Sequence, residues 1–218
     1  MTKEKCLDNA ISVFGRDNIR VFADNCGAET VEMVKSKSVP YECIKLGNAF
    51  SWRYAVEYSL NGMDPQEMVY LLEDDYFHLP ASPKALEEAL EFADYATLYD
   101  HPDKYISFEN GGPNPFIENG SEATRVWLTK SSHWKQTNST TMTFAARVQT
   151  LKEDKEVWWE FTSKGFPNDF AAFHSLQGIG SWENRIFGKK RILVSSIPGL
   201  STHGENEWIT PLHEWSTF

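Results

Sequence analysis

An unbroken apolar run, residues 68–72, is followed directly by three acidic residues, Glu73, Asp74 and Asp75. A continuous apolar segment of this length is typical of a strand that is buried on both faces, as in a parallel sheet. Three adjacent carboxylates repel one another and oppose a compact fold unless they share a cation or lie in water. The segment therefore predicts a buried strand that ends in a cation site, with a solvated acidic turn as the alternative.

The composition restricts the class of protein. The chain has 218 residues and 41% of them are apolar, which is enough for one globular domain with a real core. The formal net charge of −10 argues against sequence-independent binding of nucleic acid, which needs clustered Lys and Arg. Nucleotides stay open as ligands, because a divalent cation can bridge acidic side chains and phosphate.

The cysteines and the hydropathy pattern bear on the cellular setting. Three cysteines, Cys6, Cys26 and Cys43, give an odd count without CxxC spacing, which indicates neither a zinc site nor a disulfide framework. This cysteine content indicates a reducing compartment. No apolar stretch approaches the ~20 residues of a membrane span, and the polar first residues are unlike a signal peptide. We therefore expect a cytoplasmic protein without a transmembrane segment.

Helical and strand patterns alternate through the first half of the chain. Helical spacing or capping predicts helices at residues 3–14, 29–35, 51–60 and 82–93. β-rich runs predict strands at residues 19–23, 41–46, 68–72 and 95–99. This alternation predicts an α/β fold with an open sheet and helices on both sides. Ligands in such folds lie beyond the carboxyl ends of the strands.

The second half has a different pattern. Residues 111–120 are rich in Gly, Pro and Asn and predict a loop. Strands are expected at residues 124–129, 140–148 and 191–197, and a helix at residues 169–176. The polar and aromatic tail, residues 201–218, has no periodicity. This half therefore predicts a more irregular subregion of the same domain.

A second polar strand end occurs at Asp24-Asn25, before the small-residue turn that leads to Glu29-Thr30. A carboxylate here can accept a hydrogen bond from a nucleobase N–H, and small residues let the backbone come close. An Asx turn followed by a helix cap gives the same pattern. Taken alone, the segment favours the turn.

These segments occur in a particular order over roughly residues 5–80. Asp24-Asn25 with Glu29-Thr30 comes first, then residues 46–53 (LGNAFSWR), then the acidic triplet. The ordered set resembles the GT-A class of glycosyltransferases, especially the inverting family 2 type and its compact viral, phage or bacterial members. The resemblance implies a Rossmann-like, open and mostly parallel sheet flanked by helices. Such proteins usually begin with a strand, whereas this chain starts at its first helix, so the first strand is expected to be missing.

The resemblance divides the single domain, residues 1–218, into two halves. Residues 1–105 form the half that binds the nucleotide-sugar donor, and residues 106–218 form the half that binds the acceptor. By position, Asp24, with Asn25 beside it, contacts the base of the donor. Arg53 lies where the second helix of the family faces the diphosphate.

The acidic triplet and a late histidine form the metal site that the resemblance implies. Glu73 replaces the usual first Asp, Asp74 contacts ribose or the donor sugar, and Asp75 binds Mn²⁺ or Mg²⁺ directly. His203, which follows a strand, stands where many members of the class place a second ligand to the metal. A purely structural histidine is the alternative, and His213 is a weaker candidate for the ligand.

Inverting transfer needs a carboxylate that takes the proton from the acceptor hydroxyl. Asp169, at the start of a predicted helix, has the position that the family gives to this base, and Asp154 and Glu160 are the other candidates. A plain helix cap is the competing interpretation of Asp169. Hydroxyl-bearing residues 139–143 and the late tryptophans suit a sugar site or an ordinary core. These tryptophans are Trp134, Trp158, Trp159, Trp182, Trp208 and Trp215.

The function that these patterns predict is transfer of a hexose-type sugar by a metal-dependent glycosyltransferase. The donor would be a UDP- or GDP-sugar, the acceptor a glycan or glycoconjugate, and the transfer inverting. A sugar-phosphate nucleotidyltransferase is one alternative, although it normally needs a Gly-rich basic phosphate loop near its N-terminus. A non-catalytic carbohydrate-binding module with a degenerate transferase fold is the other.

Overall fold

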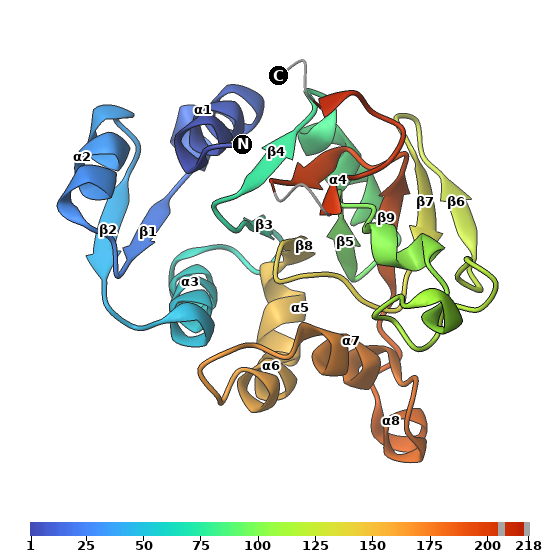
Figure 1. Ribbon diagram of the computed structural model, residues 1–218. Helices are drawn as coiled ribbons and strands as arrows, with labels where there is room; N and C mark the ends of the chain where they lie inside the picture. Colours follow the sequence, from blue (N-terminus) through green and yellow to red (C-terminus); the bar gives the residue numbers. More distant parts are fainter. Residues whose placement is uncertain (205–207, 216–218) are drawn as a thin grey trace.

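A six-stranded sheet with helices on both faces forms the centre of the protein (Figure 1). The computed structural model describes residues 1–204 and 208–215. Across the sheet the order of strands is β3 (Met68–Leu71), β8 (Phe144–Arg147), β5 (Tyr95–Thr97), β9 (Leu193–Ile197), β7 (His133–Gln136) and β6 (Val126–Leu128). The predicted α/β class is confirmed by this arrangement.

The directions of the strands differ from the mostly parallel sheet that we expected. Within the described part of the chain, β5 and β9 form the parallel pair of this sheet, and its other neighbouring strands are antiparallel. The reason lies in β8, which comes from the second half of the chain, inserts between β3 and β5, and runs opposite to both. The sheet is therefore mixed.

Two earlier strands form a separate small sheet. β1 (Val21–Asp24) and β2 (Tyr41–Ile44) pair in parallel, with α2 (Ala28–Ser36) between them in the chain. The long helix α3 (Asn48–Gly62) packs against both β1 and β3 and so connects the two sheets (Figure 1). β3 is consequently an edge strand, with Val69 and Leu71 buried and Met68 and Tyr70 half-buried.

A third sheet was not predicted and matters most for the site. β4 (Tyr76–His78) follows the acidic triplet and pairs antiparallel with β10 (Ser201–His203). Helix α1 (Lys3–Phe14) packs against β4. The short strand β4 has three buried residues in a row and β10 is polar, so neither has the period-2 alternation that marks a strand in sequence.

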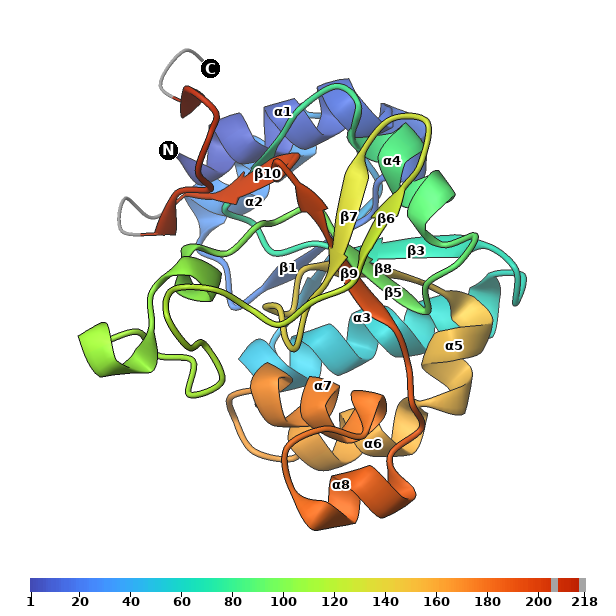
Figure 2. The same ribbon diagram turned by 90° about the vertical axis from the view of Figure 1, so that its right-hand side faces the viewer.

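Alternate residues of the central strands fill two cores. Tyr95, Phe144 and Leu193 lie in the core under α3, α5 (Val148–Glu153), α6 (Lys155–Phe161) and α7 (Asp169–Gln177). Their neighbours Ala96, Ala145 and Val194 lie in the other core, under α4 (Ser82–Ala89). Figure 2 shows α5, α6 and α7 on one side of the sheet and α1 and α4 on the other. The remaining helices are α8 (Trp182–Phe187) and the short 3₁₀ turns η1 (Arg16–Asn18), η2 (Pro102–Tyr105) and η3 (Phe108–Asn110).

A buried ion pair joins the end of α5 to the start of β9. The carboxylate of Asp154, which is 0% exposed, accepts hydrogen bonds from the Arg191 guanidinium at 2.9 Å on each oxygen and from the Tyr95 hydroxyl at 2.7 Å. Because these partners satisfy it inside the protein, Asp154 has a structural role. We therefore discard it as a candidate for the catalytic base.

Replacing Arg191 with methionine is expected to destabilise the fold by about 3 kcal/mol, because the buried charge of Asp154 then loses the guanidinium and keeps only the partly exposed Lys189, at 3.0 Å, as an ion-pair partner in the described structure. The free energy of unfolding in urea measures this loss. Arg185→Met, on the exposed face of α8, is the matched control and should change stability by less than about 0.5 kcal/mol. Equal effects of the two substitutions would show that the ion pair does not matter.

The buried imidazole of His78 gives the fold a pH dependence. Burial lowers the pKa of His78 to about 3 from 6.5. As the pH falls below about 6.5, the unfolded chain takes up a proton that the folded chain does not bind, so stability falls by up to about 1.4 kcal/mol per pH unit. His78→Gln should flatten the profile of unfolding free energy between about pH 6.5 and 4, whatever its effect at pH 7. An unchanged slope would contradict the role of His78.

Candidate functional site

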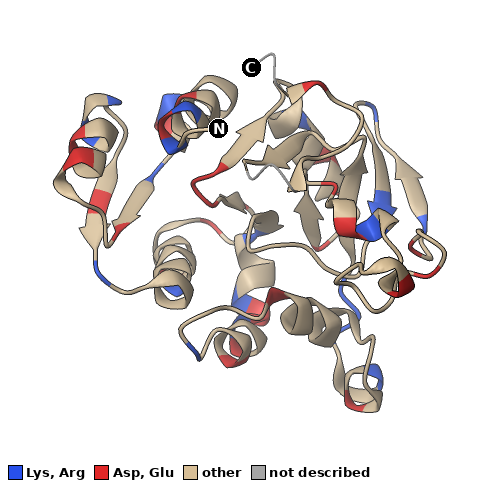
Figure 3. Cartoon of the chain, in the orientation of Figure 1, with Lys and Arg blue, Asp and Glu red and all other residues tan. Residues whose placement is uncertain are grey.

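The acidic triplet lies in the loop between β3 and β4, where Figure 3 shows a red segment. The pairing of β10 with β4 brings a histidine beside it. The backbone N–H of Gly204 donates to the backbone oxygen of Asp75 at 2.7 Å, and His203 pairs with Tyr76 in the strand register. These contacts bring His203 Nε2 to 3.3 Å from Asp75 Oδ2. Asp75 and His203, far apart in the chain, thus lie side by side as the sequence interpretation requires.

The surroundings of Asp75 suit a cation. Burial raises the pKa of Asp75, and the neighbouring His203 opposes that rise. Its Oδ1 atom is buried and has no hydrogen-bond partner within the described structure. Residues 1–204 and 208–215 contain no group of three or more His, Cys, Asp or Glu side chains arranged to hold a metal ion. Two protein ligands fit Mn²⁺ or Mg²⁺ of the kind that is completed by substrate phosphates and water.

The three acids of the triplet have different environments. Glu73 points inward: its carboxylate accepts from the Thr143 hydroxyl at 3.1 Å, and burial raises the pKa of Glu73 to about 7. Asp74 points outward and pairs with Lys3 of α1 at 2.7 Å. The exposure of Asp75 is intermediate between that of Glu73 and that of Asp74. The repulsion that the sequence suggests is therefore relieved by one carboxyl that tends to hold its proton and by an ion pair with Lys3.

The Asp24 carboxylate accepts hydrogen bonds from the protein backbone, in contrast to the expected contact with a nucleobase. Its carboxylate accepts from the backbone N–H groups of Leu46 at 2.7 Å and Gly47 at 2.9 Å. Asn25 adopts a positive φ of 53° and its side-chain amide donates to Asp24. These bonds fasten the end of β1 to the start of α3. They are long-range bonds and not the local Asx turn with a helix cap that was the alternative, since the N-cap of α2 is Gly27, without a side-chain bond. The structure thus places Asp24 and Asn25 at the right strand end but gives both Asp24 carboxylate oxygens backbone partners.

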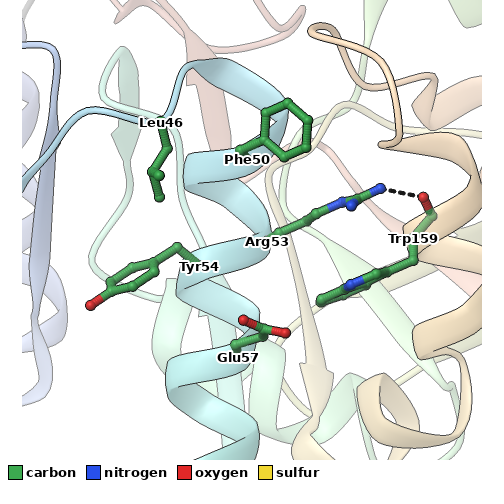
Figure 4. A pocket seen from close by; sticks show the side chains of 6 residues that line it. All are labelled: Leu46, Phe50, Arg53, Tyr54, Glu57 and Trp159. Atoms are coloured by element: carbon green, nitrogen blue, oxygen red, sulfur yellow. Dashed lines mark hydrogen bonds between the residues drawn. The ribbon is translucent and has the colours of Figure 1, made fainter.

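Arg53 lies away from the triplet, in contrast to the expectation that it faces a diphosphate. Its Nε donates to the Thr162 hydroxyl at 2.7 Å, and a second nitrogen donates to the backbone oxygen of Trp159 (Figure 4). The guanidinium also lies over the rings of Trp159 and Phe50. Because α3 turns this residue toward α6, Arg53 lines an open pocket of about 300 Å³ with Leu46, Phe50, Tyr54, Glu57 and Trp159.

Asp169 lines a polar cavity of about 120 Å³. The cap of α7 is Asn168, whose side chain accepts from the N–H of Ala171 at 3.1 Å, so Asp169 is not needed as the N-cap. Burial raises the pKa of Asp169. The cavity is also lined by His101, Asp103, Lys104, Ser139, Thr140, Thr141 and Phe170. The two carboxyl groups, the hydroxyls and the ring of Phe170 are groups of the kind that a polyhydroxylated ligand contacts.

Two hydroxyl residues connect this cavity to the triplet. Thr141, in the cavity wall, hydrogen-bonds the Tyr76 hydroxyl at 2.8 Å, and Thr143 hydrogen-bonds Glu73. Burial and the charge of Asp75 raise the pKa of Glu73, and the charge of Asp169 adds to that rise. Residues 139–143 therefore contact both the cavity and the segment of the acidic triplet. The alternating pattern in the sequence did not decide between this role and an ordinary strand.

Lys104 was missed as a site residue, and His101 was recognised only as part of a polar strand end, without a role in the site. The side chain of Lys104 is 3% exposed and donates to Asn138 and Ser139, while burial lowers its pKa. The ring of Trp208 lies 5.0 Å from that of His101, so one of the late tryptophans packs against a residue of the cavity wall. Asp100-His101 is a polar strand end in the sequence, which was a usable signal for His101, whereas a single lysine in a 3₁₀ turn gives no comparable signal.

The other candidates lie elsewhere. Glu160 is exposed on α6, and His213 packs against Trp215 near the end of the described chain. Trp134 and Trp158 belong to the cores, and Trp182 is largely exposed on α8. Late tryptophans thus serve mainly in packing, with Trp208 as the one that adjoins the cavity of Asp169.

Comparison with models of known families and with curated proteins finds no match for this sequence. Among the described residues, none of the helices has the length and apolar character needed to span a bilayer. The fold and the site together define an α/β protein with an Asp–His pair at a strand end, beside a hydroxyl-lined cavity that contains the carboxyl groups of Asp103 and the half-buried Asp169.

Proposed function

We propose that the protein is a metal-dependent glycosyltransferase of the GT-A type, with a UDP- or GDP-sugar as donor and a glycan or glycoconjugate as acceptor. The observation that carries the proposal is the approach of His203 to Asp75, 3.3 Å apart, next to the cavity of Asp169. A pair of side chains that could hold a cation, beside a half-buried carboxyl group, suits transfer from a phosphate leaving group to a hydroxyl.

Asp75 and His203 are the residues that would hold Mn²⁺ or Mg²⁺. The buried Oδ1 of Asp75, without a hydrogen-bond partner in the described structure, supports this assignment because a bound cation satisfies such an oxygen. When bound, the cation offsets the negative charge of the diphosphate. Asp74, which is exposed and pairs with Lys3, would contact the ribose or the donor sugar.

Asp169 is the proposed general base. An acceptor hydroxyl in its cavity gives its proton to the carboxylate, while the hydroxyl oxygen forms a bond to the anomeric carbon of the donor. The bond from that carbon to the diphosphate oxygen breaks, and the diphosphate leaves with the electron pair. Because the attack comes from the side opposite the leaving group, the configuration is inverted. Burial raises the pKa of Asp169, which makes its ionised form a better proton acceptor.

The setting we propose is the cytoplasm. All three cysteines are free thiols, and two of them, Cys26 and Cys43, are exposed. Exposed thiols persist in a reducing compartment and are prone to oxidation outside it.

Turnover of nucleotide sugars tests the proposal. UDP- and GDP-sugars are incubated with the protein and Mn²⁺, and release of UDP or GDP is followed with and without glycan acceptors. Metal-dependent release of the diphosphate is expected. Release of pyrophosphate from a nucleoside triphosphate and a sugar phosphate would instead identify a nucleotidyltransferase. Binding of glycans without any turnover of the tested donors would identify a binding module.

A further inference from the structure

Lys3, the first residue of α1, contacts the acidic triplet, although the two are far apart in the sequence. Its ammonium group donates to both carboxylate oxygens of Asp74, at 2.9 and 2.7 Å, across a separation of 71 residues. The two side chains are 66% and 65% exposed, so a ligand from solvent can reach both of them. The contact is therefore open to exchange, unlike the buried pair of Asp154 and Arg191.

Helix α1 is fixed in the position that brings Lys3 to the site. The side-chain amide of Asn9 donates to the backbone oxygen of His78 at 3.0 Å and accepts from the His78 N–H at 2.7 Å, as a neighbouring strand would. On its other side, Glu4 and Asp8 both pair with Lys37, just after α2, at 2.8 Å. Because α1 is tied to β4 and to the end of α2, the approach of Lys3 to Asp74 follows from the packing of the helix.

The hydrogen bonds to Asp74 place the Lys3 ammonium group at the loop between β3 and β4, beside the residue that precedes Asp75. The pKa of Lys3 is raised, first by the hydrogen bond to Asp74 and further by the charge of Asp75. A diphosphate bound to a cation on Asp75 would come close to this ammonium group.

We propose that Lys3 is a phosphate-binding residue of the donor site, whose ammonium group moves from Asp74 to a diphosphate oxygen when the nucleotide binds. The inference rests on the proposed function of the same site. An ammonium group makes charge-assisted hydrogen bonds to phosphate that are about twice as strong as neutral ones. Lys3 thereby fills the role that the sequence interpretation gave to Arg53, which faces α6 instead.

The inference predicts two effects of opposite sign when Lys3 is replaced by glutamine. Affinity for UDP or GDP in the presence of Mn²⁺ falls roughly tenfold, because one charge-assisted contact to phosphate is lost. Affinity for Mn²⁺ alone rises by a few-fold, because a positive charge beside Asp75 is removed. A purely structural role of Lys3 would weaken both affinities together or leave both unchanged.

Calorimetric titration of the full chain with Mn²⁺ alone, and then with UDP and GDP in saturating Mn²⁺, measures both effects. Lys3→Gln is compared with Lys3→Arg, which keeps the charge and should keep most of the nucleotide affinity. Lys5→Gln is the matched control, since Lys5 is exposed on the same helix, its side chain makes no contact with the triplet, and both affinities should stay unchanged.

The outcomes of this titration distinguish the role of Lys3 from the proposed function of the protein. Opposite shifts for Lys3→Gln, with Lys5→Gln unchanged, support the phosphate-binding role. Normal nucleotide affinity of Lys3→Gln overturns the role of Lys3 while the proposed function stands. If the wild-type chain itself binds neither UDP nor GDP with Mn²⁺, both the role and the proposed function are overturned.

Discussion

The substitution Asp75→Asn is expected to abolish metal-dependent turnover of the donor and to weaken Mn²⁺-dependent binding of UDP or GDP by on the order of 10³-fold. Asp75 supplies the carboxylate of the Asp–His pair, and its Oδ1 is buried without a hydrogen-bond partner in the described structure. A cation that loses one of two protein ligands loses several kcal/mol of binding. Titration of Mn²⁺ and of nucleotide against Asp75→Asn measures the loss.

The fold should survive Asp75→Asn, because the strand pairing at this position uses the Asp75 backbone oxygen and not its side chain. Thermal unfolding and far-UV circular dichroism close to those of the wild type are therefore expected. A variant that is folded and still binds nucleotide in a Mn²⁺-dependent way would refute the assignment of Asp75 as a metal ligand.

Asp169→Asn is expected to lower the rate of sugar transfer by about 10²- to 10⁴-fold, with donor binding unchanged, since the amide cannot accept the proton of the acceptor hydroxyl. Asn168 caps α7, so the helix keeps its cap in this variant. Single-turnover transfer and calorimetric binding of the donor separate the two effects. A variant in which donor binding falls and the transfer step stays fast would show that Asp169 is not the base.

Glu160→Gln is the control for Asp169→Asn, because Glu160 was the other remaining candidate for the base and is exposed on α6. Its transfer rate should equal that of the wild type. The pH profile adds an independent readout. Burial raises the pKa of Asp169, so the rate of transfer should fall as the pH is lowered through a pKa above the ordinary range of aspartate.

Local signals predicted the elements of the fold well where capping and periodicity coincide. Helix α1 spans the expected residues 3–14, because Thr2 caps its start and Gly15, with φ of 84°, ends it. Helix α7 begins after the predicted cap Asn168. Such signals act within a few residues, so a single sequence displays them.

The arrangement of the strands depends on contacts that no local pattern encodes. Residues 140–148 were predicted to contain a strand, yet nothing in them specifies that β8 inserts between β3 and β5 and runs antiparallel to both. The strand pair β4 and β10 was missed because three buried residues in one and three polar residues in the other lack alternation. The mixed sheet is the result of such long-range pairing.

The carboxylates and the histidine of the candidate site could be predicted from the sequence, whereas its basic side chains could not. Glu73, Asp74, Asp75 and His203 stood out by their positions at strand ends, and β4 and β10 bring the last two together. Lys3 carries no motif, and its relation to Asp74 arises from the packing of α1 on β4. Arg53 matched a family position, but the direction of its side chain depends on α6.

Calorimetric titration of the wild-type protein with UDP and with GDP, each with Mn²⁺ and with a chelator in its place, tests the central claim most directly. We expect one of the two nucleotides to bind with Mn²⁺ and to lose that binding in the chelator, because Asp75 and His203 would hold the cation that receives the diphosphate. Absence of binding under all four conditions, or equal binding with and without the metal, would contradict a metal-dependent nucleotide-sugar site.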